Sequence, residues 1–410
     1  MMERVETVVV GGGQAGLAIS HHLKELRQEH LVLERARVAE NWRTQRWDSL
    51  MFQFPNWSIE LPGYAYTGDD PEGFSHKDDI LRFIEDYGAR IQAPLRTGVN
   101  VLSLRPDAQA GRYVVLTDHG ELKARNVVIA TGPYQRPRVP QLSAGFPADV
   151  VQLHASEYRN PAALPSGAVL VVGSGGSGCQ IADELVEAGR RVYLSVGRHR
   201  RFPRRYRGRD FFWWWRALGR HDRTVDDSPE ARHMARPLIT GVHGGYDIDL
   251  RRSAANGVRL LGHLLGISDG RAALAPDLEE NLRRGDQAFA DFQREADDYV
   301  SRTGIDVPQP QSDQSHAYTT GAVEAPSVID VRAATIRSVI WATGYALDFD
   351  WVELPIFDER SEPVHRRGVT AAPGIYFLGL SWLYKRTSAF LCGVGQDARY
   401  LAERIAEDRR

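Results

Sequence analysis

Cysteine is scarce in this chain, and its scarcity argues against a disulfide-stabilised fold and against a cysteine-ligated metal site. The 410 residues include two cysteines, Cys179 and Cys392, which form no CxxC pair and no spacing typical of a metal site. A disulfide framework is therefore excluded, and we expect a reducing, cytoplasmic setting. Residues 243–250 (HGGYDIDL) hold a histidine and two aspartates, but one such cluster is weak evidence for a metal. The sequence predicts no metal site.

Long apolar runs, a secretion signal and an excess of one charge are also lacking. No stretch approaches about 18 apolar residues, so we expect no membrane span, and the N-terminus has no signal-peptide pattern. The formal net charge of −2 gives no general attraction to nucleic acid or anionic membranes. A hydrophobic fraction of 42% with 25% charged residues is typical of a globular protein. The length predicts two or three domains.

A glycine loop follows the first apolar run, in VETVVVGGGQAGLAISHHL. The first glycine of such a loop, here Gly11, allows a tight turn, and the second, Gly13, lets the backbone approach a pyrophosphate. The third, Gly16, lets a helix pack on the preceding strand with its N-terminus facing the anion. The next strand, residues 30–35, ends in Glu34, whose carboxylate can accept hydrogen bonds from a ribose diol. This unit suits FAD or NAD.

A second loop of the same kind lies at residues 169–185, VLVVGSGGSGCQIADEL, with Gly173, Gly175 and Gly178 at the same spacing. A glycine-rich turn in an ordinary βαβ unit is the simpler interpretation of either loop. In both cases, however, an apolar strand precedes the loop, a helix follows it, and a second strand comes at the right distance. Two dinucleotide-binding units are therefore predicted.

The second unit differs from the first at the end of its second strand, RVYLSVGR. We place Ser195 at the position of Glu34, with Arg198 and Arg200 just beyond. No acid repels a 2′-phosphate there, and arginine can bind one. The second loop therefore favours NADP over NAD, and one loop is expected to hold a flavin and the other the nicotinamide that reduces it.

The order of these units predicts an α/β fold with two Rossmann-like dinucleotide-binding domains, one for FAD and one for NADP, the second inserted in the first. Proline and glycine cluster at residues 133–167, where we place a crossing between domains. Two further strands, NVVIATG and TIRSVIWATGY, run into small-residue turns. The predicted ranges are 1–160 plus 331–410 for FAD, and 161–330 for NADP, which includes a partly helical lid or substrate insertion at 199–330.

These motifs resemble the class B flavin-dependent monooxygenases, which include flavin-containing monooxygenases and plant-type indole-pyruvate monooxygenases. The resemblance covers the chain except about 200–330. It rests on the two glycine fingerprints and on two ATG turns, residues 130–132 and 342–344, the second of which is similar to the family's FATGY.

The family's FxGxxxHxxx(F/Y) signature is half present, in ADVVQLHASEY. His154 and Tyr158 match, whereas Ala148 and Val150 stand where phenylalanine and glycine are expected. Taken alone, His154 is more typical of a packed, hydrogen-bonded histidine at a domain crossing than of an acid–base group.

The resemblance implies that NADPH reduces FAD and that reduced flavin reacts with O₂ at C4a to give a peroxyflavin. That species would oxygenate a small hydrophobic or aromatic substrate. The resemblance also makes Trp42 and Arg43 flavin contacts, and Gln53 the polar residue beside flavin N5 and the one catalytic candidate. Relatives have asparagine or histidine at this last position. The C-terminal helix is expected to start near Gln396, at the pyrimidine edge of the flavin.

Together these observations define a set of candidate site residues. The predicted cofactor contacts are Gly11, Gly13, Gln14, Ala15, Gly16, Glu34, Arg35, Trp42, Arg43, Thr131, Gly132, Gly173, Ser174, Gly175, Ser177, Gly178, Ser195, Arg198, Ala342, Thr343, Gly344 and Gln396.

Three other functions remain open. A pyridine-nucleotide disulfide reductase has the same plan but needs a redox-active cysteine pair near the flavin, which this sequence does not provide. An NADPH-dependent flavin reductase that does not activate oxygen fits the motifs. A redox-sensing protein that binds FAD without turnover would show no NADPH oxidation.

The insertion begins with arginines interleaved with aromatic residues, in RHRRFPRRYRGRDFFWWWRALG (198–219). Such a pattern can bind nucleic acid or lie on a membrane surface. We favour a lid in which Phe211, Phe212 and Trp213 to Trp215 partly line a substrate channel, because small-molecule sites usually have apolar walls. The expected partners are a small-molecule substrate and O₂, without nucleic acid or integral membrane contact. A homodimer contact through an exposed aromatic insert stays open.

Overall fold

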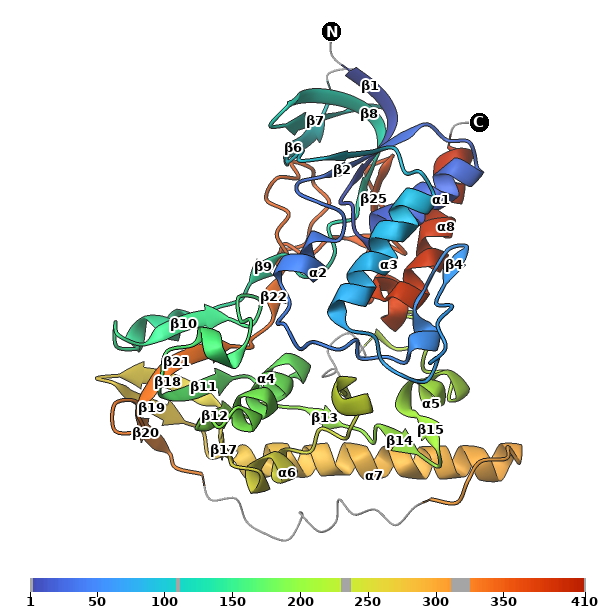
Figure 1. The fold of residues 1–410 in the computed structure, drawn as a ribbon. Coiled ribbons are helices and arrows are strands. Elements are labelled where there is room, and N and C mark those ends of the chain that lie inside the picture. The colour runs from blue at the N-terminus through green and yellow to red at the C-terminus, as the bar shows by residue number, and fades with distance from the viewer. Residues whose placement is uncertain (1–2, 108–110, 230–236, 311–324, 409–410) are drawn as a thin grey trace.

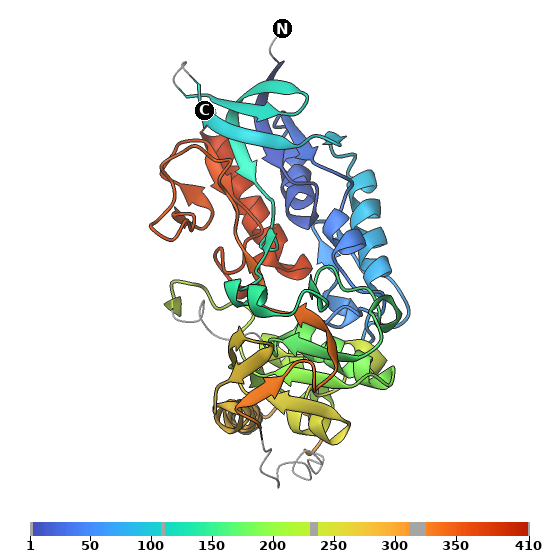
Figure 2. The same ribbon diagram turned by 90° about the vertical axis from the view of Figure 1, so that its left-hand side faces the viewer.

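The protein consists of two lobes, each built around its own β-sheet (Figures 1 and 2). The computed structural model describes residues 3–107, 111–229, 237–310 and 325–408. No helix within these ranges combines the length and the apolar character needed to cross a bilayer.

The first sheet has nine strands, with the path β23-β24-β25-β8-β1-β2-β5 and a β6–β7 hairpin attached to β8. Its central strands pair in parallel and contain short apolar runs, such as Val8–Val10 in β1 and Val127–Ile129 in β8, because a parallel sheet is covered on both faces. The parallel strands are β1 (Glu3–Val10), β2 (His30–Glu34), β5 (Leu95–Thr97), β8 (Gly120–Ile129) and β25 (Ile375–Phe377). The antiparallel edge strands are β6 (Val101–Pro106), β7 (Tyr113–Thr117), β23 (His365–Arg366) and β24 (Val369–Thr370).

Three helices cover this sheet: α1 (Gln14–Glu25), α3 (Lys77–Arg90) and α8 (Leu391–Glu407). Helix α1 buries Leu17, Ile19 and Leu23, as the period of its apolar residues predicts. Between the first sheet and the second lobe runs the aromatic-rich segment 40–75, which contains α2 (Glu40–Thr44) and the short hairpin β3 (Glu60–Leu61) and β4 (Tyr64–Ala65).

The second sheet is parallel throughout, in the order β10-β21-β11-β12-β17, and α4 (Gly176–Glu187) packs on it. Its strands are β10 (Val151–His154), β21 (Ile336–Trp341), β11 (Ala168–Val172), β12 (Val192–Ser195) and β17 (Val258–Leu261). Strands β10 and β21 lie within the ranges predicted for the first domain, yet their hydrogen bonds join them to β11 and its neighbours. Strand pairing therefore assigns less chain to the first lobe than the predicted limits at 160 and 331.

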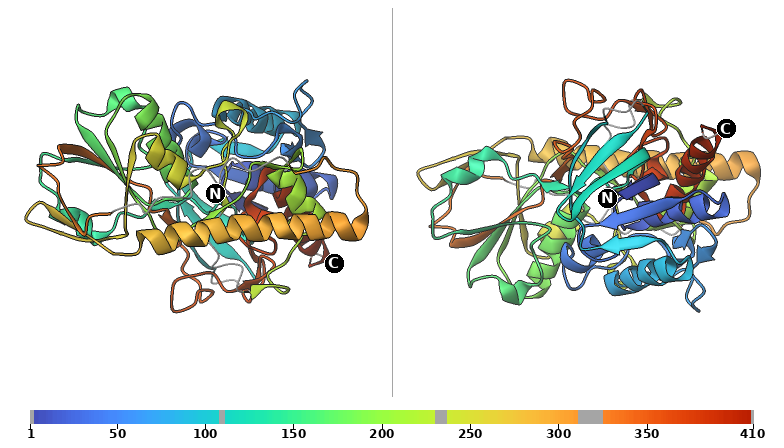
Figure 3. Two further views of the ribbon diagram at one scale, coloured as in Figure 1. Left: turned by 90° about the horizontal axis from the view of Figure 1, so that it is seen from below. Right: turned by 90° about the horizontal axis from the view of Figure 1, so that it is seen from above.

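The segment 199–330 is more than an added lid, because it supplies β17 to the second sheet. A long helix, α7 (Leu278–Thr303), runs beneath both lobes, as Figure 3 shows from below. The other elements of this segment are β13 (Arg200–Arg201), β14 (Arg205–Tyr206), β15 (Arg209–Asp210), α5 (Phe211–Ala217), β16 (Pro237–Leu238), α6 (Leu250–Ala255), β18 (Leu264–Ser268), β19 (Arg271–Leu274) and β20 (Val328–Asp330). Residues 230–236 and 311–324 of the predicted insertion lie outside the described ranges.

The two crossings between the lobes run side by side. Strand β9 (Arg136–Pro137) pairs antiparallel with β22 (Tyr345–Ala346). Next to this ribbon, buried His154 donates from Nε2 to the carbonyl of Gly344, at 3.0 Å, and its Nδ1 lies 2.8 Å from the Ser156 hydroxyl. Burial lowers the pKa of His154, which favours the neutral ring. These contacts support a structural role for His154 at the crossing.

Candidate functional site

The first glycine loop is closely packed against backbone at Gly11 and Gly16 and is open at Gly13. Gly11 has φ of +115°, and a Cβ there would lie 2.6 Å from the Ala130 carbonyl oxygen. A Cβ on Gly16 would lie 1.9 Å from the Gly11 carbonyl oxygen, whereas one on Gly13 would meet nothing within 4 Å. The open side faces the N-terminus of α1, where a pyrophosphate would bind.

Glu34 closes the end of this loop. Its carboxylate accepts hydrogen bonds from the backbone N–H of Gly12 at 2.7 Å and of Ala36 at 3.0 Å. The carboxylate is thus fixed beside the loop at the end of β2, where a ribose diol would bind. Arg35, also predicted to contact a cofactor, is exposed beside it.

Two other predicted contacts join α1 to the segment that leads into α8. The Gln14 side chain donates to the Ala389 carbonyl at 2.7 Å. A Cβ on Gly379 would lie 2.6 Å from the Ala15 methyl group, so the backbone passes very close to the helix start. The first loop is therefore bound to the C-terminal part of the same lobe.

The second loop repeats the first almost atom for atom. Gly173 has φ of +107°, and its Cβ would lie 2.6 Å from the Ala342 carbonyl oxygen. A Cβ on Gly178 would lie 1.8 Å from the Gly173 carbonyl oxygen, and Gly175 is open. Ser177, in the first turn of α4, is exposed. The alanine of each ATG turn thus packs directly against the first glycine of one loop.

Both ATG threonines contact the crossing between the lobes. The Thr131 hydroxyl accepts from the Gln135 amide at 2.9 Å, and that amide also donates to the Gly132 carbonyl at 2.8 Å. The Thr343 hydroxyl donates to the Arg138 carbonyl. The cofactor loops and the inter-lobe ribbon are therefore one connected structure.

The placement of Ser195 opposite Glu34 is wrong by one residue. Val10 pairs with Leu33, and Val172 pairs with Ser195, so Ser195 is the counterpart of Leu33. The Ser195 hydroxyl is buried, donates to the Gly262 carbonyl and accepts from the Leu264 N–H, both at 3.1 Å. It joins β12 to the turn after β17 and does not face a cofactor. Glu34 follows Gly11 by 23 positions, and the residue 23 positions after Gly173 is Val196, in agreement with the strand pairing.

Val196 is the true counterpart of Glu34, and the absence of an acid there still holds. The Ser174 hydroxyl accepts from the Gly197 N–H at 3.1 Å and so fixes the backbone just before Arg198. Arg198 is exposed, and within the described part of the chain it has no hydrogen bond or ion pair. Its guanidinium is therefore available for a phosphate at this edge.

The predicted flavin contacts in α2 have different surroundings. Arg43 forms an ion pair with Glu85 of α3, so its guanidinium belongs to the α2–α3 contact. Trp42 is half-buried, and the Arg46 guanidinium lies 5.3 Å from its ring centroid and equally far from that of Tyr134. Sequence reasoning did not single out Arg46, which lies just after the end of α2.

Gln53, the catalytic candidate, is fixed through a hydrogen bond to its backbone carbonyl. Its carbonyl accepts from the Arg204 guanidinium at 2.8 Å, while its half-buried side-chain amide has no hydrogen bond within the described residues. Arg204 is only 2% exposed, forms a two-pronged pair with Asp210 at 2.6 to 2.9 Å, and has its pKa lowered by burial. Sequence reasoning missed Arg204, because this residue lies in the arginine-rich stretch interpreted as a lid.

The aromatic run of α5 forms a core rather than a channel wall. Phe211, Phe212, Trp214 and Trp215 are at most 4% exposed and pack with Phe202 and Phe292, while Trp213 is partly exposed. The channel lining predicted for them is therefore wrong for four of the five. A short helix with apolar residues on all sides is buried all round.

This core does contact the candidate site. The Phe212 ring centroid lies 4.5 Å from that of Phe54, the residue after Gln53, and 5.5 Å from that of Trp57. The segment after Gln53 is thus packed against the insertion, and most of the run is unavailable for a dimer contact.

Gln396 does not mark the start of the last helix. Helix α8 begins at Leu391, so Gln396 lies in its second turn, exposed, with its amide oxygen accepting from the Lys385 ammonium at 2.9 Å. The predicted start near Gln396 is thus too late in the sequence. The free N–H groups at the N-terminus of this helix therefore belong to the residues near Leu391.

Neither cysteine is poised for redox chemistry. Burial raises the pKa of Cys179 and raises that of Cys392 to about 12. Both thiols are free, and they belong to different hydrophobic clusters. A reactive thiol needs a lowered pKa and access to solvent, so the geometry argues against disulfide reduction.

Comparison with known proteins agrees with this architecture. The family described as pyridine nucleotide-disulphide oxidoreductase matches residues 8–208. A protein of Geobacillus kaustophilus (strain HTA426), described as an uncharacterized oxidoreductase CzcO-like, is 35% identical over 409 residues, which is 99% of each chain. The chain belongs to this CzcO-like oxidoreductase family. Indole-3-pyruvate monooxygenase YUCCA1 of rice (Oryza sativa subsp. japonica) is 34% identical over 201 residues, 47% of this chain and 49% of the rice protein.

Among solved structures, a mutant flavin monooxygenase from Stenotrophomonas maltophilia matches with a TM-score of 0.69 and 20% identity over the full length of both chains. This likeness confirms the predicted α/β fold with two dinucleotide-binding domains. The match to the rice monooxygenase confirms the predicted resemblance to flavin-dependent monooxygenases in sequence. The two loops of this CzcO-like oxidoreductase fit FAD and NADP(H), since both are glycine cradles at helix N-termini and only the first ends in a carboxylate.

Proposed function

We propose that this oxidoreductase is an NADPH-dependent FAD monooxygenase that oxygenates a small hydrophobic organic molecule. One observation carries the proposal. Two equivalent glycine loops for dinucleotides lie in adjoining lobes, and they differ at the position expected to contact the ribose, which is Glu34 in the first unit and Val196 in the second. A protein that binds two dinucleotides in this way can move a hydride between them. The likeness to the rice and Stenotrophomonas monooxygenases supports oxygen as the final acceptor.

The residues of this chain would bind, orient and shield the cofactors. The first loop and Glu34 would hold FAD, and the second loop and Arg198 would hold NADPH. Bound FAD would supply the redox chemistry, taking a hydride from NADPH and passing electrons to O₂. The half-buried Gln53 amide would donate a hydrogen bond at the reactive edge. The packing of Phe54 on Phe212 would keep water from that edge.

The alternative is an NADPH-dependent flavin reductase that does not activate oxygen. The same cradles would serve both, so only the fate of the electrons distinguishes them. We also propose a cytoplasmic location, which the two free cysteines support.

The test uses the purified, FAD-loaded protein. We expect NADPH to reduce the flavin anaerobically much faster than NADH does. Mixing with ¹⁸O₂ in the presence of methyl phenyl sulfide, indole-3-pyruvate or cyclohexanone should give one product carrying a single ¹⁸O atom per NADPH consumed. Complete recovery of the electrons as H₂O₂ with every probe would favour the reductase, and a flavin that NADPH cannot reduce would overturn both.

Gln53→Leu provides a residue-level test of the same proposal. We expect unchanged FAD content but a larger share of electrons released as H₂O₂, because the amide no longer reaches the flavin edge. Gln287→Leu is the matched control, since that amide lies exposed on α7 and bonds only to Asp291 within the described residues. Equal H₂O₂ yields from the two variants would remove Gln53 from the site.

A further inference from the structure

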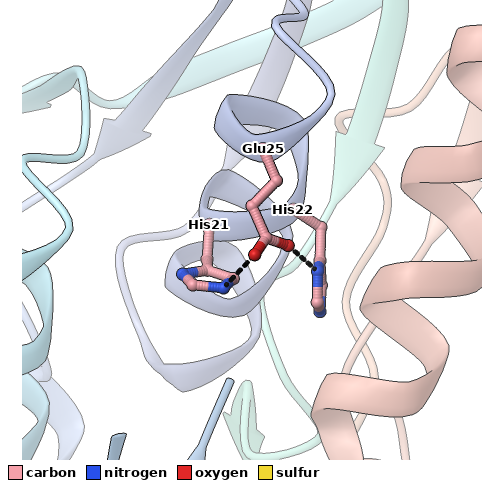
Figure 4. Close-up of side chains that lie close together, drawn as sticks. All are labelled: His21, His22 and Glu25. Atoms are coloured by element: carbon pink, nitrogen blue, oxygen red, sulfur yellow. Dashed lines mark hydrogen bonds and ion pairs between the residues drawn. The ribbon is translucent and has the colours of Figure 1, made fainter. Parts of the chain in front are cut away.

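The last turn of α1 carries a cluster of nitrogen and oxygen ligands far along the helix from its cofactor loop. Nε2 of His21 lies 3.3 Å from one carboxylate oxygen of Glu25, and Nδ1 of His22 lies 2.9 Å from the other. Figure 4 shows both rings turned toward this carboxylate. The three ligand atoms lie within 4.8 Å of one another, so a single ion could contact all of them.

The spacing follows from the helix. Residues three and four positions apart share a face, so Glu25 reaches both His22 and His21. The side chains of the two histidines are 13% and 21% exposed, and that of Glu25 is 59% exposed, so the imidazoles are partly fixed by their surroundings and the carboxylate is free to adjust. Two imidazoles and one carboxylate form a ligand set that zinc takes with an open fourth position.

A second feature at the same place points to a ligand. Two of the three residues, His21 and Glu25, line a surface hollow of about 330 Å³, which is also lined by Tyr87 of α3. Tyr87 is fully buried, its ring centroid lies 6.2 Å from that of His21, and its hydroxyl has no hydrogen-bond partner. Buried hydroxyls are rarely left unpaired. A water on a bound ion would give this hydroxyl its partner.

The charges around the hollow permit a cation. The Lys24 ammonium is held by the carbonyls of Ile91 and Gln92, and the Arg90 guanidinium lies 5.6 Å from the Tyr64 ring centroid. Glu25 is also the last residue of α1, where the carbonyl ends of the helix carry partial negative charge and favour a cation.

We propose that His21, His22 and Glu25 bind a divalent first-row transition metal of the Zn²⁺ class, with Tyr87 as the partner of a metal-bound water. The ion would fasten the end of α1 to α3 and is independent of the flavin chemistry. Hard cations such as Mg²⁺ and Ca²⁺ prefer sites made of oxygen ligands and are not expected to bind here.

The test uses chelator-treated, FAD-loaded protein titrated with Zn²⁺ by calorimetry and with Co²⁺ by visible absorption. We expect one saturable site for each ion and no binding of Mg²⁺. Loss of an outer partner typically weakens metal affinity about 10- to 100-fold, so loss of a direct ligand in His21→Ala, His22→Ala or Glu25→Gln should weaken it by about 100-fold or more. Tyr87→Phe should weaken it by about tenfold.

His119→Ala is the matched control, because His119 is an exposed histidine 2.9 Å from the carboxylate of Asp118 and, among the described residues, belongs to no group of three metal ligands. It should keep the affinity of the unaltered protein. Flavin absorbance and far-UV circular dichroism would establish that each variant is folded. An unaltered protein without saturable Zn²⁺ binding, or ligand variants that bind as tightly as the control, would overturn the proposal.

Discussion

Two glycines of the second loop, three residues apart, should respond in opposite ways to the same added methyl group. At Gly178 a Cβ would lie 1.8 Å from the Gly173 carbonyl oxygen, and real Cβ atoms essentially never come closer than 3.0 Å. At Gly175 the backbone has φ of −73° and ψ of 177°, which any residue adopts, and no atom lies within 4 Å. Gly178→Ala should therefore harm the fold, and Gly175→Ala should harm only the binding of NADPH.

The size of each effect follows from these distances. In Gly178→Ala the loop and helix must separate by about 1.2 Å, which places the cost near the upper end of overpacking, about 3 kcal/mol. For a unit of 150–250 residues this lowers Tm by roughly 6–12 °C. Gly175→Ala should leave stability unchanged or raise it by about 0.4–1 kcal/mol, because alanine restricts the unfolded chain.

Gly175→Ala should weaken NADPH binding because its methyl group would occupy space that the pyrophosphate needs. A methyl group on the open side of the loop would push the pyrophosphate away from the α4 N-terminus. Losing one charged hydrogen bond costs about 1.5–3 kcal/mol, which is roughly a 10- to 150-fold rise in the Kd for NADPH.

The assay pairs thermal unfolding with anaerobic NADPH titration of both variants, with FAD content as the internal control. The matching first-loop pair, Gly16→Ala and Gly13→Ala, should show the same contrast, with loss of FAD in place of NADPH. The reasoning fails if Gly175→Ala binds NADPH normally, because the pyrophosphate would then lie elsewhere. It also fails if Gly178→Ala unfolds at the unaltered temperature.

Three further outcomes follow from the structure. Arg198→Ala should raise the Kd for NADPH about tenfold and leave NADH unchanged in parallel titrations; equal effects on both would exclude contact with a 2′-phosphate. Arg204→Met leaves Asp210 buried without its partner and should lower the free energy of unfolding by about 3–5 kcal/mol in denaturant titrations, whereas the double variant Arg204→Met with Asp210→Leu should recover most of it. Burial lowers the pKa of His154 in the folded state, so the unfolded chain binds more protons and stability falls as pH drops below about 6.5. His154→Gln should flatten part of the fall in Tm between pH 7 and 5, and an unchanged curve would exclude this origin.

Much of the site could be predicted because its causes are local. Each glycine loop is defined by residues within about 25 positions of one another, and the structure gives Gly11 and Gly173 the positive φ that only a glycine adopts easily. The change from Glu34 to a residue without charge is equally local. The counterpart of Glu34 could also have been found from the sequence, because Glu34 follows Gly11 by 23 positions and Val196 follows Gly173 by the same number, as the strand pairing confirms.

The burial and contacts of the arginine-rich insertion could be determined only from the tertiary structure. Its sequence favoured a lid, yet Arg204 lies buried against Asp210 and donates to the Gln53 carbonyl, which is 151 residues away in the sequence. Whether a charged residue is buried depends on the partner that the fold brings to it. The domain boundaries could not be predicted accurately for the same reason, because β21 pairs with β11 although the two strands are far apart in the sequence.

The sequence by itself determined the kind of cradle, its number and the charge at its edge, because glycine conformation and side-chain charge are properties of single residues and their near neighbours. Only the tertiary structure decided which side chains face those cradles, since burial and strand register arise from contacts between distant segments. The same holds for the cluster at the end of α1. Its two histidines and glutamate lie within five residues of the sequence, but the hollow and the unpaired Tyr87 hydroxyl beside them exist only because α3 packs there.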